Sequence, residues 1–176
     1  MSTEGSAAVE ALRMAIQMEI DGKEFYLKAS RESTNALGQK LLQTLADEED
    51  GHQRKFKEIY DTIKHTRDWP SATFQLDGGK HLRTVFMNES QKIGSKIKAL
   101  PSELDAVKVA MKMENKTFDF YKSQATKAAH PAEKEFYQAV AAEESEHHLI
   151  LADYYEYLSN PAAWFVQKEH PSLDGG

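Results

Sequence analysis

The stretch LADEEDGH, residues 45–52, places charged side chains on the otherwise apolar face of a predicted helix. Glu49 and His52 are three residues apart, so they share one side of that helix, about one turn from each other. The same side carries Leu45 and Phe56, which have the spacing of buried residues. A helix that directs a carboxylate and an imidazole toward the core of the protein predicts a buried polar site.

The same arrangement occurs a second time in VAAEESEH, residues 140–147, which contains Glu144 and His147. A shift of 95 residues, from Glu49 to Glu144, aligns the two halves of the chain. It also aligns several flanking residues: Glu19 with Glu114, Tyr26 with Tyr121 and Glu48 with Glu143. The chain therefore contains an internal repeat, in which each half carries an inward Glu and an inward Glu-x-x-His.

Helical periodicity and boundary residues divide the repeat into helices. Apolar residues recur with a helical period in four segments, at about 6–33, 36–63, 103–129 and 131–158. The Ser-Thr-Asn cluster at 33–35 suits a turn and an N-cap, Ser102 with Asp105 resembles a capping box, and Pro131 fits a first helical turn. A further short helix is expected between residues 81 and 100.

The spacing of the acidic residues predicts how the helices pair. Glu19 and Glu49 are 30 residues apart with Thr34 midway, so a hairpin folded there sets both carboxylates about 22 Å from the turn, at about 1.5 Å per residue. Glu114 and Glu144 have the same separation. Two antiparallel hairpins joined by a long crossover form an all-α four-helix bundle. We expect one domain over residues 1–176, with hairpin 6–63, crossover 64–101, hairpin 102–158 and tail 159–176.

Such a bundle would collect four carboxylates and two imidazoles in its interior. Burying an unpaired charge costs several kcal/mol, whereas a domain has about 5–15 kcal/mol of total stability. Two divalent cations would offset this charge, and oxygen with imidazole ligands suits iron or manganese, with zinc also possible. The candidate ligands are Glu19, Glu49, His52, Glu114, Glu144 and His147.

The neighbours of these ligands lead to several further expectations. Tyr26 and Tyr121 either pack in the core or hydrogen-bond to a ligand carboxylate across the bundle. Burial and mutual repulsion are expected to raise the pKa values of all four inward carboxylates in the metal-free protein. Glu48, Glu143 and Glu146 are expected to be solvated, with Glu146 the first substitute ligand.

Four quoted segments carry a resemblance to a known family: AIQMEIDGKEFY (15–26), LADEEDGH, AMKMENKTFDFY (110–121) and AAEESEHH (141–148). They resemble the ferritin-like superfamily and, within it, the rubrerythrin group, across all four helices. The tail segment YEYLSNPAAWF (155–165) is similar to the end of members that consist of the bundle alone. The resemblance implies a di-iron site held by the six residues named above.

The chain also departs from the family pattern. Rubrerythrins proper have a rubredoxin domain with four cysteines, and this chain has no cysteine. Their additional Glu, one turn after the third-helix ligand, corresponds here to Thr117, and Gly22 occupies the repeat-related position. These two small residues would leave room for the oxidant beside the metals, and they argue against the family's usual route to peroxidase chemistry.

Three functions are compatible with this pattern. The leading hypothesis is an oxidoreductase that reacts with peroxide or dioxygen and receives electrons from an external donor. The second is iron oxidation for storage or detoxification, and the third is a metal-binding bundle without turnover. A homodimer is expected because the tail and crossover carry apolar aromatic residues: Trp69, Phe74, Phe86, Trp164 and Phe165. The resemblance to rubrerythrins, some of which exchange helices between subunits, allows the same exchange here.

Composition limits the other possibilities. The chain of 176 residues has a net charge of −6 and no large basic block, which argues against nucleic-acid binding. The lack of cysteine excludes disulfides, thiolate zinc sites and iron–sulfur clusters. No apolar run approaches the roughly 20 residues needed to cross a bilayer, and the N-terminus lacks the pattern of a signal peptide. We therefore expect a cytoplasmic protein.

Overall fold

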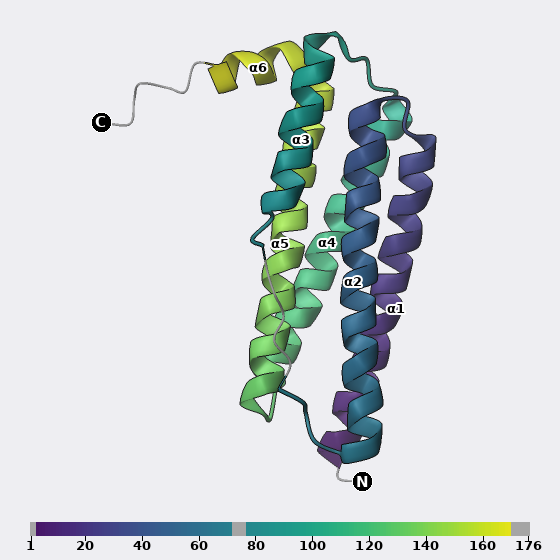
Figure 1. Ribbon diagram of the computed structural model, residues 1–176, viewed down its shortest axis with the longest axis vertical. Coiled ribbons are helices and arrows are strands. Elements are labelled where there is room, and N and C mark those ends of the chain that lie inside the picture. Colours follow the sequence, from purple (N-terminus) through teal and green to yellow (C-terminus); the bar gives the residue numbers. More distant parts are fainter. Residues whose placement is uncertain (1–2, 72–76, 170–176) are drawn as a thin grey trace, which may run out of the picture.

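The computed structural model describes residues 3–71 and 77–169, and within these ranges it is entirely helical apart from connections. Four long helices run side by side, with a shorter helix against them and a last one at an end (Figure 1). The helices are α1 Thr3–Glu32, α2 Ala36–Thr66, α3 Lys80–Ile93, α4 Pro101–Lys127, α5 Pro131–Ser159 and α6 Pro161–Glu169. A short 3₁₀ turn, Gly94–Lys96, follows α3.

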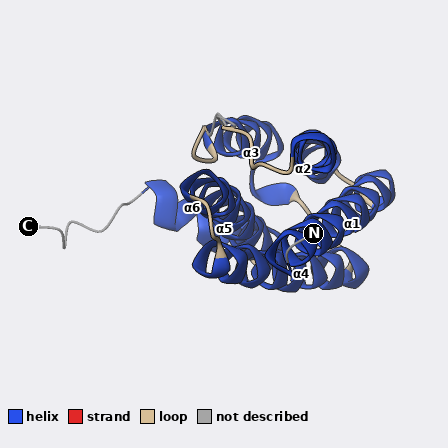
Figure 2. Ribbon diagram, turned by 90° about the horizontal axis from the view of Figure 1, so that it is seen from below, coloured by secondary structure: helices blue, strands red, loops and turns tan. Residues whose placement is uncertain are grey.

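The long helices pair as α1 with α2 and α4 with α5, each pair forming an antiparallel hairpin (Figure 1). The all-α bundle expected from the periodicity is thus confirmed, and the short helix expected between residues 81 and 100 is α3. Seen along the bundle, α3 lies beside α2 and α5, and it contacts both (Figure 2). It brings the chain to the end of the bundle where α4 begins.

Boundary residues explain where three of the helices start. The side chain of Asn35 accepts a hydrogen bond from the Gly38 backbone N–H at 2.7 Å and caps α2. Pro131 is the first residue of α5, where its missing N–H costs no helical hydrogen bond. The cap expected at Ser102 is wrong: α4 begins at Pro101, which already has a suitable fixed φ.

Glu103 takes the role that was expected of Asp105, and it also joins the two hairpins. Its carboxylate accepts the Leu100 backbone N–H at 3.1 Å, which satisfies a donor at the start of α4. It also accepts the backbone N–H of Thr34 at 2.6 Å and the Thr34 hydroxyl at 2.8 Å. The turn between α1 and α2 is therefore fixed to the first turn of α4.

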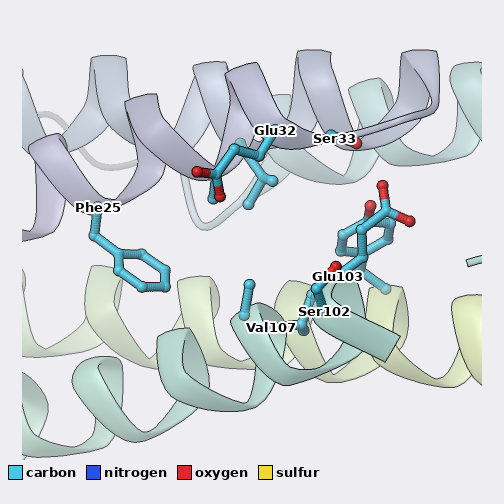
Figure 3. A pocket seen from close by; sticks show the side chains of 10 residues that line it. Phe25, Glu32, Ser33, Ser102, Glu103 and Val107 are labelled. Atoms are coloured by element: carbon cyan, nitrogen blue, oxygen red, sulfur yellow. The ribbon is translucent and has the colours of Figure 1, made fainter. Parts of the chain in front are cut away.

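A small cavity of about 50 Å³ lies beside this contact, between α1 and α4 (Figure 3). Phe25 and Val107 line one part of it, and Ser33 and Glu103 line the other. Val107 is seven residues before Glu114, which corresponds to about 10 Å along α4 at about 1.5 Å per residue. The cavity therefore belongs to the end of the bundle.

The apolar core of the bundle has two parts, with polar residues between them. One cluster is built near the α1–α2 turn around Leu41, Leu45 and Leu151. The other is built toward the opposite end around Leu12 and Phe56. On every long helix, the inward-facing acidic residue falls between the residues of the two clusters. The two apolar clusters are therefore separated by a polar level, where the candidate ligands lie.

The aromatic residues of the tail pack on the chain itself. Trp164 is 4% exposed, and its ring centroid is 5.4 Å from those of Phe86 and Tyr157. This packing shows that α6 covers part of the bundle. It also removes much of the apolar surface that suggested a homodimer, so the dimer stays a prediction with less support. Phe74 and residues 170–176 lie outside the described residues.

Across residues 3–71 and 77–169, none of the helices combines the length and apolar character that crossing a membrane requires.

The contacts of Glu103 predict a specific loss of stability. We expect Glu103→Ala to lower the free energy of unfolding by about 2 kcal/mol, because charged hydrogen bonds are lost and the N–H of Thr34 loses its acceptor. Asp105→Ala, at an exposed position in the same part of α4, is the matched control and should change stability by less than about 0.5 kcal/mol. Urea unfolding followed by circular dichroism measures both. Equal effects of the two substitutions would contradict the role assigned to Glu103.

Candidate metal centre

Six inward side chains from four helices meet at the polar level of the bundle. α1 contributes one of them, α4 contributes one, and α2 and α5 contribute two each from their Glu-x-x-His motifs. Each is at most 3% exposed. We call this set the central cluster: Glu19, Glu49, His52, Glu114, Glu144 and His147. The structure thus brings together all six residues that the sequence nominated as ligands.

The central cluster divides into two overlapping groups of four. In each group, one nitrogen or carboxylate oxygen per residue lies within 4.8 Å of those of the other three. Glu49 and Glu144 belong to both groups. The first group is completed by Glu19 and His52, and the second by Glu114 and His147. This pattern suits two neighbouring cations that share two carboxylates.

Both imidazoles direct Nδ1 into the cluster. His52 Nδ1 lies 3.3 Å from an oxygen of Glu19 and 3.3 Å from one of Glu144. His147 Nδ1 lies 3.0 Å from an oxygen of Glu49 and 3.4 Å from one of Glu114. The two rings are nearly parallel, at 11°, with centroids 5.6 Å apart. Each imidazole can therefore serve one of the two groups.

The two tyrosines connect the hairpins across the bundle. The hydroxyl of Tyr26 in α1 donates to Glu114 in α4, and the hydroxyl of Tyr121 in α4 donates to Glu19 in α1. The structure shows both roles left open for these residues: each ring is buried in an apolar cluster, and each hydroxyl bonds to a cluster carboxylate. The two hydrogen bonds therefore hold Glu114 and Glu19, the carboxylates that each belong to a single group of four.

The two small residues beside the cluster differ in role. Gly22 is buried, and a Cβ atom at its position would lie 2.8 Å from an oxygen of Glu49, so glycine leaves space for that carboxylate. Thr117 is half-buried, and its hydroxyl donates to the backbone oxygen of Met113 in its own helix at 2.9 Å. The hydroxyl of Thr117 is therefore directed to the backbone instead of a cluster carboxylate.

The hydrogen bonds of the described residues do not satisfy the cluster. Glu19 Oε2, Glu49 Oε1 and both carboxylate oxygens of Glu144 are buried and accept no hydrogen bond within that part of the chain. Buried polar atoms are normally paired, so orphaned oxygens that converge on one region indicate a missing partner. Carboxylate and imidazole donors without sulfur fit divalent iron, manganese or zinc. The residues present therefore fit a metal centre.

The carboxylates differ in how their environment shifts their pKa values. Burial and the charge of neighbouring carboxylates raise the pKa values of Glu49 and Glu144 well above the ordinary range. For Glu114, burial raises the pKa, but the adjacent His147 and hydrogen bonds outweigh it and lower the pKa to about 2. The same balance, with His52, lowers the pKa of Glu19. The expectation of four raised pKa values is therefore wrong for two of them.

The pKa values of the two imidazoles are raised, although burial alone would lower them. Burial lowers the pKa of His52, but the charges of the nearby Glu19 and Glu49 raise it more. Burial also lowers the pKa of His147, while Glu114 and further carboxylates raise it well above the ordinary value. In the metal-free protein, positive imidazoles therefore compensate part of the carboxylate charge.

Two acidic residues expected in solvent are instead part of the site's surroundings. Glu48 Oε2 lies 2.6 Å from His147 Nε2, and Glu143 is 7% exposed. The expectation that both are solvated is wrong. Their spacing could have indicated this, since each stands four residues before a cluster histidine and so lies beside it on the helix. Glu146, expected as the first substitute ligand, instead pairs with Arg83 at 3.0 Å and belongs to neither group of four.

The comparisons with known proteins agree with this geometry. The model of the family described as Rubrerythrin matches residues 10–155, which include the four long helices almost entirely and all six residues of the central cluster. Neither the comparison with curated proteins nor the comparison with solved structures found a match. The family match covers most of the chain, and the chain therefore belongs to the rubrerythrin family.

Proposed function

We propose that the central cluster binds two divalent metal ions, with iron as the working metal, and that the loaded protein is an oxidoreductase acting on peroxide or dioxygen. One observation carries the proposal: two buried four-residue groups share Glu49 and Glu144. The orphaned carboxylate oxygens and the rubrerythrin family match support it. Manganese and zinc suit the same donors and are substitutes.

The roles of the residues follow from the groups to which they belong. Glu49 and Glu144 would be shared by both ions, Glu19 and His52 would complete one position, and Glu114 and His147 the other. Two divalent ions balance four carboxylates, which removes the repulsion that burial makes costly.

Iron bound there would supply the electrons that reduce the oxidant by changing between its ferrous and ferric states. The phenols of Tyr26 and Tyr121 hold Glu114 and Glu19 in place and keep a proton at a ligand oxygen. Gly22, which has no Cβ, leaves the space that the carboxylate of Glu49 occupies. Because the chain has no cysteine for an iron–sulfur or rubredoxin-type centre, we propose that its electrons come from a separate donor.

Metal removal should make stability depend on pH in a defined sense. Glu49, Glu144 and both imidazoles have raised pKa values, so their contribution to stability is present at low pH and is lost as pH rises. Glu19 and Glu114 have lowered values, so their contribution is lost only as pH falls through the acid range. Between about pH 5 and about pH 7.5 the metal-free protein should therefore become less stable as pH rises.

Metal ions bind the folded state and remove the repulsion, so they should raise the melting temperature more at about pH 7.5 than at about pH 5. Scanning calorimetry with and without Mn²⁺ at both values measures this difference. A metal-free protein that melts higher at about pH 7.5 would contradict the assignment of the raised groups.

Two isosteric substitutions should affect the metal-free protein in opposite directions near neutral pH. Glu144→Gln removes a carboxylate whose ionisation burial opposes, so the melting temperature should stay equal or rise. Glu114→Gln removes the charged acceptor of Tyr26 and should lower the free energy of unfolding by about 1.5–3 kcal/mol. Thermal unfolding after chelator treatment compares the two with wild type. Two equal effects would mean that the carboxylates do not differ as their surroundings predict.

The redox proposal predicts both a metal content and a reaction. Elemental analysis of iron-loaded protein should give two ions per chain, and anaerobic mixing with peroxide should produce ferric absorbance in a stopped-flow instrument. Glu144→Gln should lose both properties because it serves both groups. Glu156→Gln, an exposed change in the same helix, should retain them.

Two outcomes would reassign the function. Two bound ions that peroxide and dioxygen leave unoxidised would favour a metal-binding bundle without turnover. Oxidation coupled to assembly of a large hollow particle would favour iron storage, and the native mass from light scattering detects such a particle.

A further inference from the structure

A second group of metal-type donors lies outside the central cluster, and we call it the outer group: Glu48, Glu143 and Nε2 of His147. One donor atom from each residue lies within 4.8 Å of the other two. Glu143 is 7% exposed, yet no hydrogen bond or ion pair joins its carboxylate to another described residue. A largely buried carboxylate that no described residue binds, beside a second carboxylate and an imidazole nitrogen, supplies the donor set of a cation site.

His147 stands between the two sites. Its Nδ1 faces Glu49, Glu114 and Glu144 of the central cluster, at 3.0–3.4 Å. Its Nε2 faces Glu48 of the outer group at 2.6 Å. One imidazole therefore presents a different nitrogen to each site.

The position of the outer group connects it to solvent. Glu48 and Glu143 occupy repeat-related positions on α2 and α5, so the group lies where the two hairpins face each other. This is the side along which α3 runs, since α3 contacts both helices (Figure 2). The side chain of Glu48 is 20% exposed, whereas those of Glu144 and His147 are fully buried. An ion could therefore reach the outer group before it reaches the central cluster.

We propose that Glu48, Glu143 and Nε2 of His147 form an outer divalent-cation site through which metal ions enter the central cluster. The proposal rests on the metal centre proposed above. Two carboxylates and one imidazole suit Fe²⁺, Mn²⁺, Co²⁺ and Zn²⁺. The residues that follow Glu48 and Glu143 are the shared carboxylates Glu49 and Glu144, so the transfer is between neighbouring donors.

Binding and release at the outer site balance in protons. An entering cation takes the place of the proton on Nε2 of His147, and that proton leaves to solvent. When the cation moves inward, it takes the place of the proton on Nδ1, which leaves to solvent, while Nε2 takes up a proton again and donates a hydrogen bond to Glu48. No electron transfer or other reactant is required.

Glu143→Gln is the sharpest test, with Co²⁺ as the probe under anaerobic conditions. The substitution removes a charge from a side chain that makes no hydrogen bond or ion pair to another described residue. The fold should therefore be retained. Glu146→Gln, three residues further along the same helix and paired with Arg83 at the protein surface, is the matched control. Visible absorbance in a stopped-flow instrument measures how fast cobalt fills the centre, and equilibrium dialysis measures how much is bound.

Wild type and Glu146→Gln should fill at the same rate, and Glu143→Gln should fill at least about tenfold more slowly, as expected when a charged entrance that concentrates cations is removed. In crystals with excess Co²⁺, wild type should show a third anomalous peak among Glu48, Glu143 and His147, and Glu143→Gln should lack it. Glu48→Gln, whose amide oxygen still accepts from Nε2, should also lose the peak.

A wild-type rate of filling in Glu143→Gln, or a wild-type crystal with two central ions and no third peak, would overturn the proposal. Either result leaves the central site intact. Failure of the central site itself gives a different result, namely no cobalt at the central cluster of wild type, and it would overturn the proposed function instead.

Discussion

Four carboxylates buried at one level of a helical bundle are the constraint on which the rest of this structure depends. An interior that contained only these charges would not be stable, because each desolvated ion costs several kcal/mol. The fold meets this cost with two inward imidazoles, two phenols that donate across the bundle, and a geometry that suits cations. The apolar clusters on either side hold the four helices in the register that brings these groups together.

The two hairpins share this compensation between them. Tyr26 serves a carboxylate of the second hairpin, and Tyr121 serves a carboxylate of the first. Each hairpin therefore depends on the other for a hydrogen bond as well as for packing. Glu103 adds a third connection, since it fixes the turn of the first hairpin to the start of the second. The two hairpins are thus joined at the polar level by tyrosine–carboxylate hydrogen bonds and at the end of the bundle by the contact of Glu103 with the turn.

The sequence was sufficient to predict the helices, their pairing and the six central residues, because each rests on spacing along a regular helix. Tyr26 and Tyr121 were recognised, but their acceptors lie on other helices, so one-dimensional spacing left two roles open. The capping role of Glu103 was missed because the helix was expected to start after Ser102, whereas α4 begins at Pro101. Its contact with Thr34 was missed because the two residues are distant in sequence. The lowered pKa of Glu114 depends on which of several buried neighbours it touches, and composition alone suggested the opposite sign.

The two hairpins make the centre nearly symmetric, but its surroundings are different on opposite sides. The phenols come from α1 and α4, whereas Glu48, Glu143 and both imidazoles come from α2 and α5, the side along which α3 runs. One flank of the centre is therefore rich in hydroxyl donors and the other in anionic acceptors. Such a centre is polarised: the carboxylates of Glu48 and Glu143 attract cations on the α2–α5 side, whereas the hydroxyls on the α1–α4 side are already bonded to Glu19 and Glu114. If metal enters as proposed, it would therefore approach from the α2–α5 side.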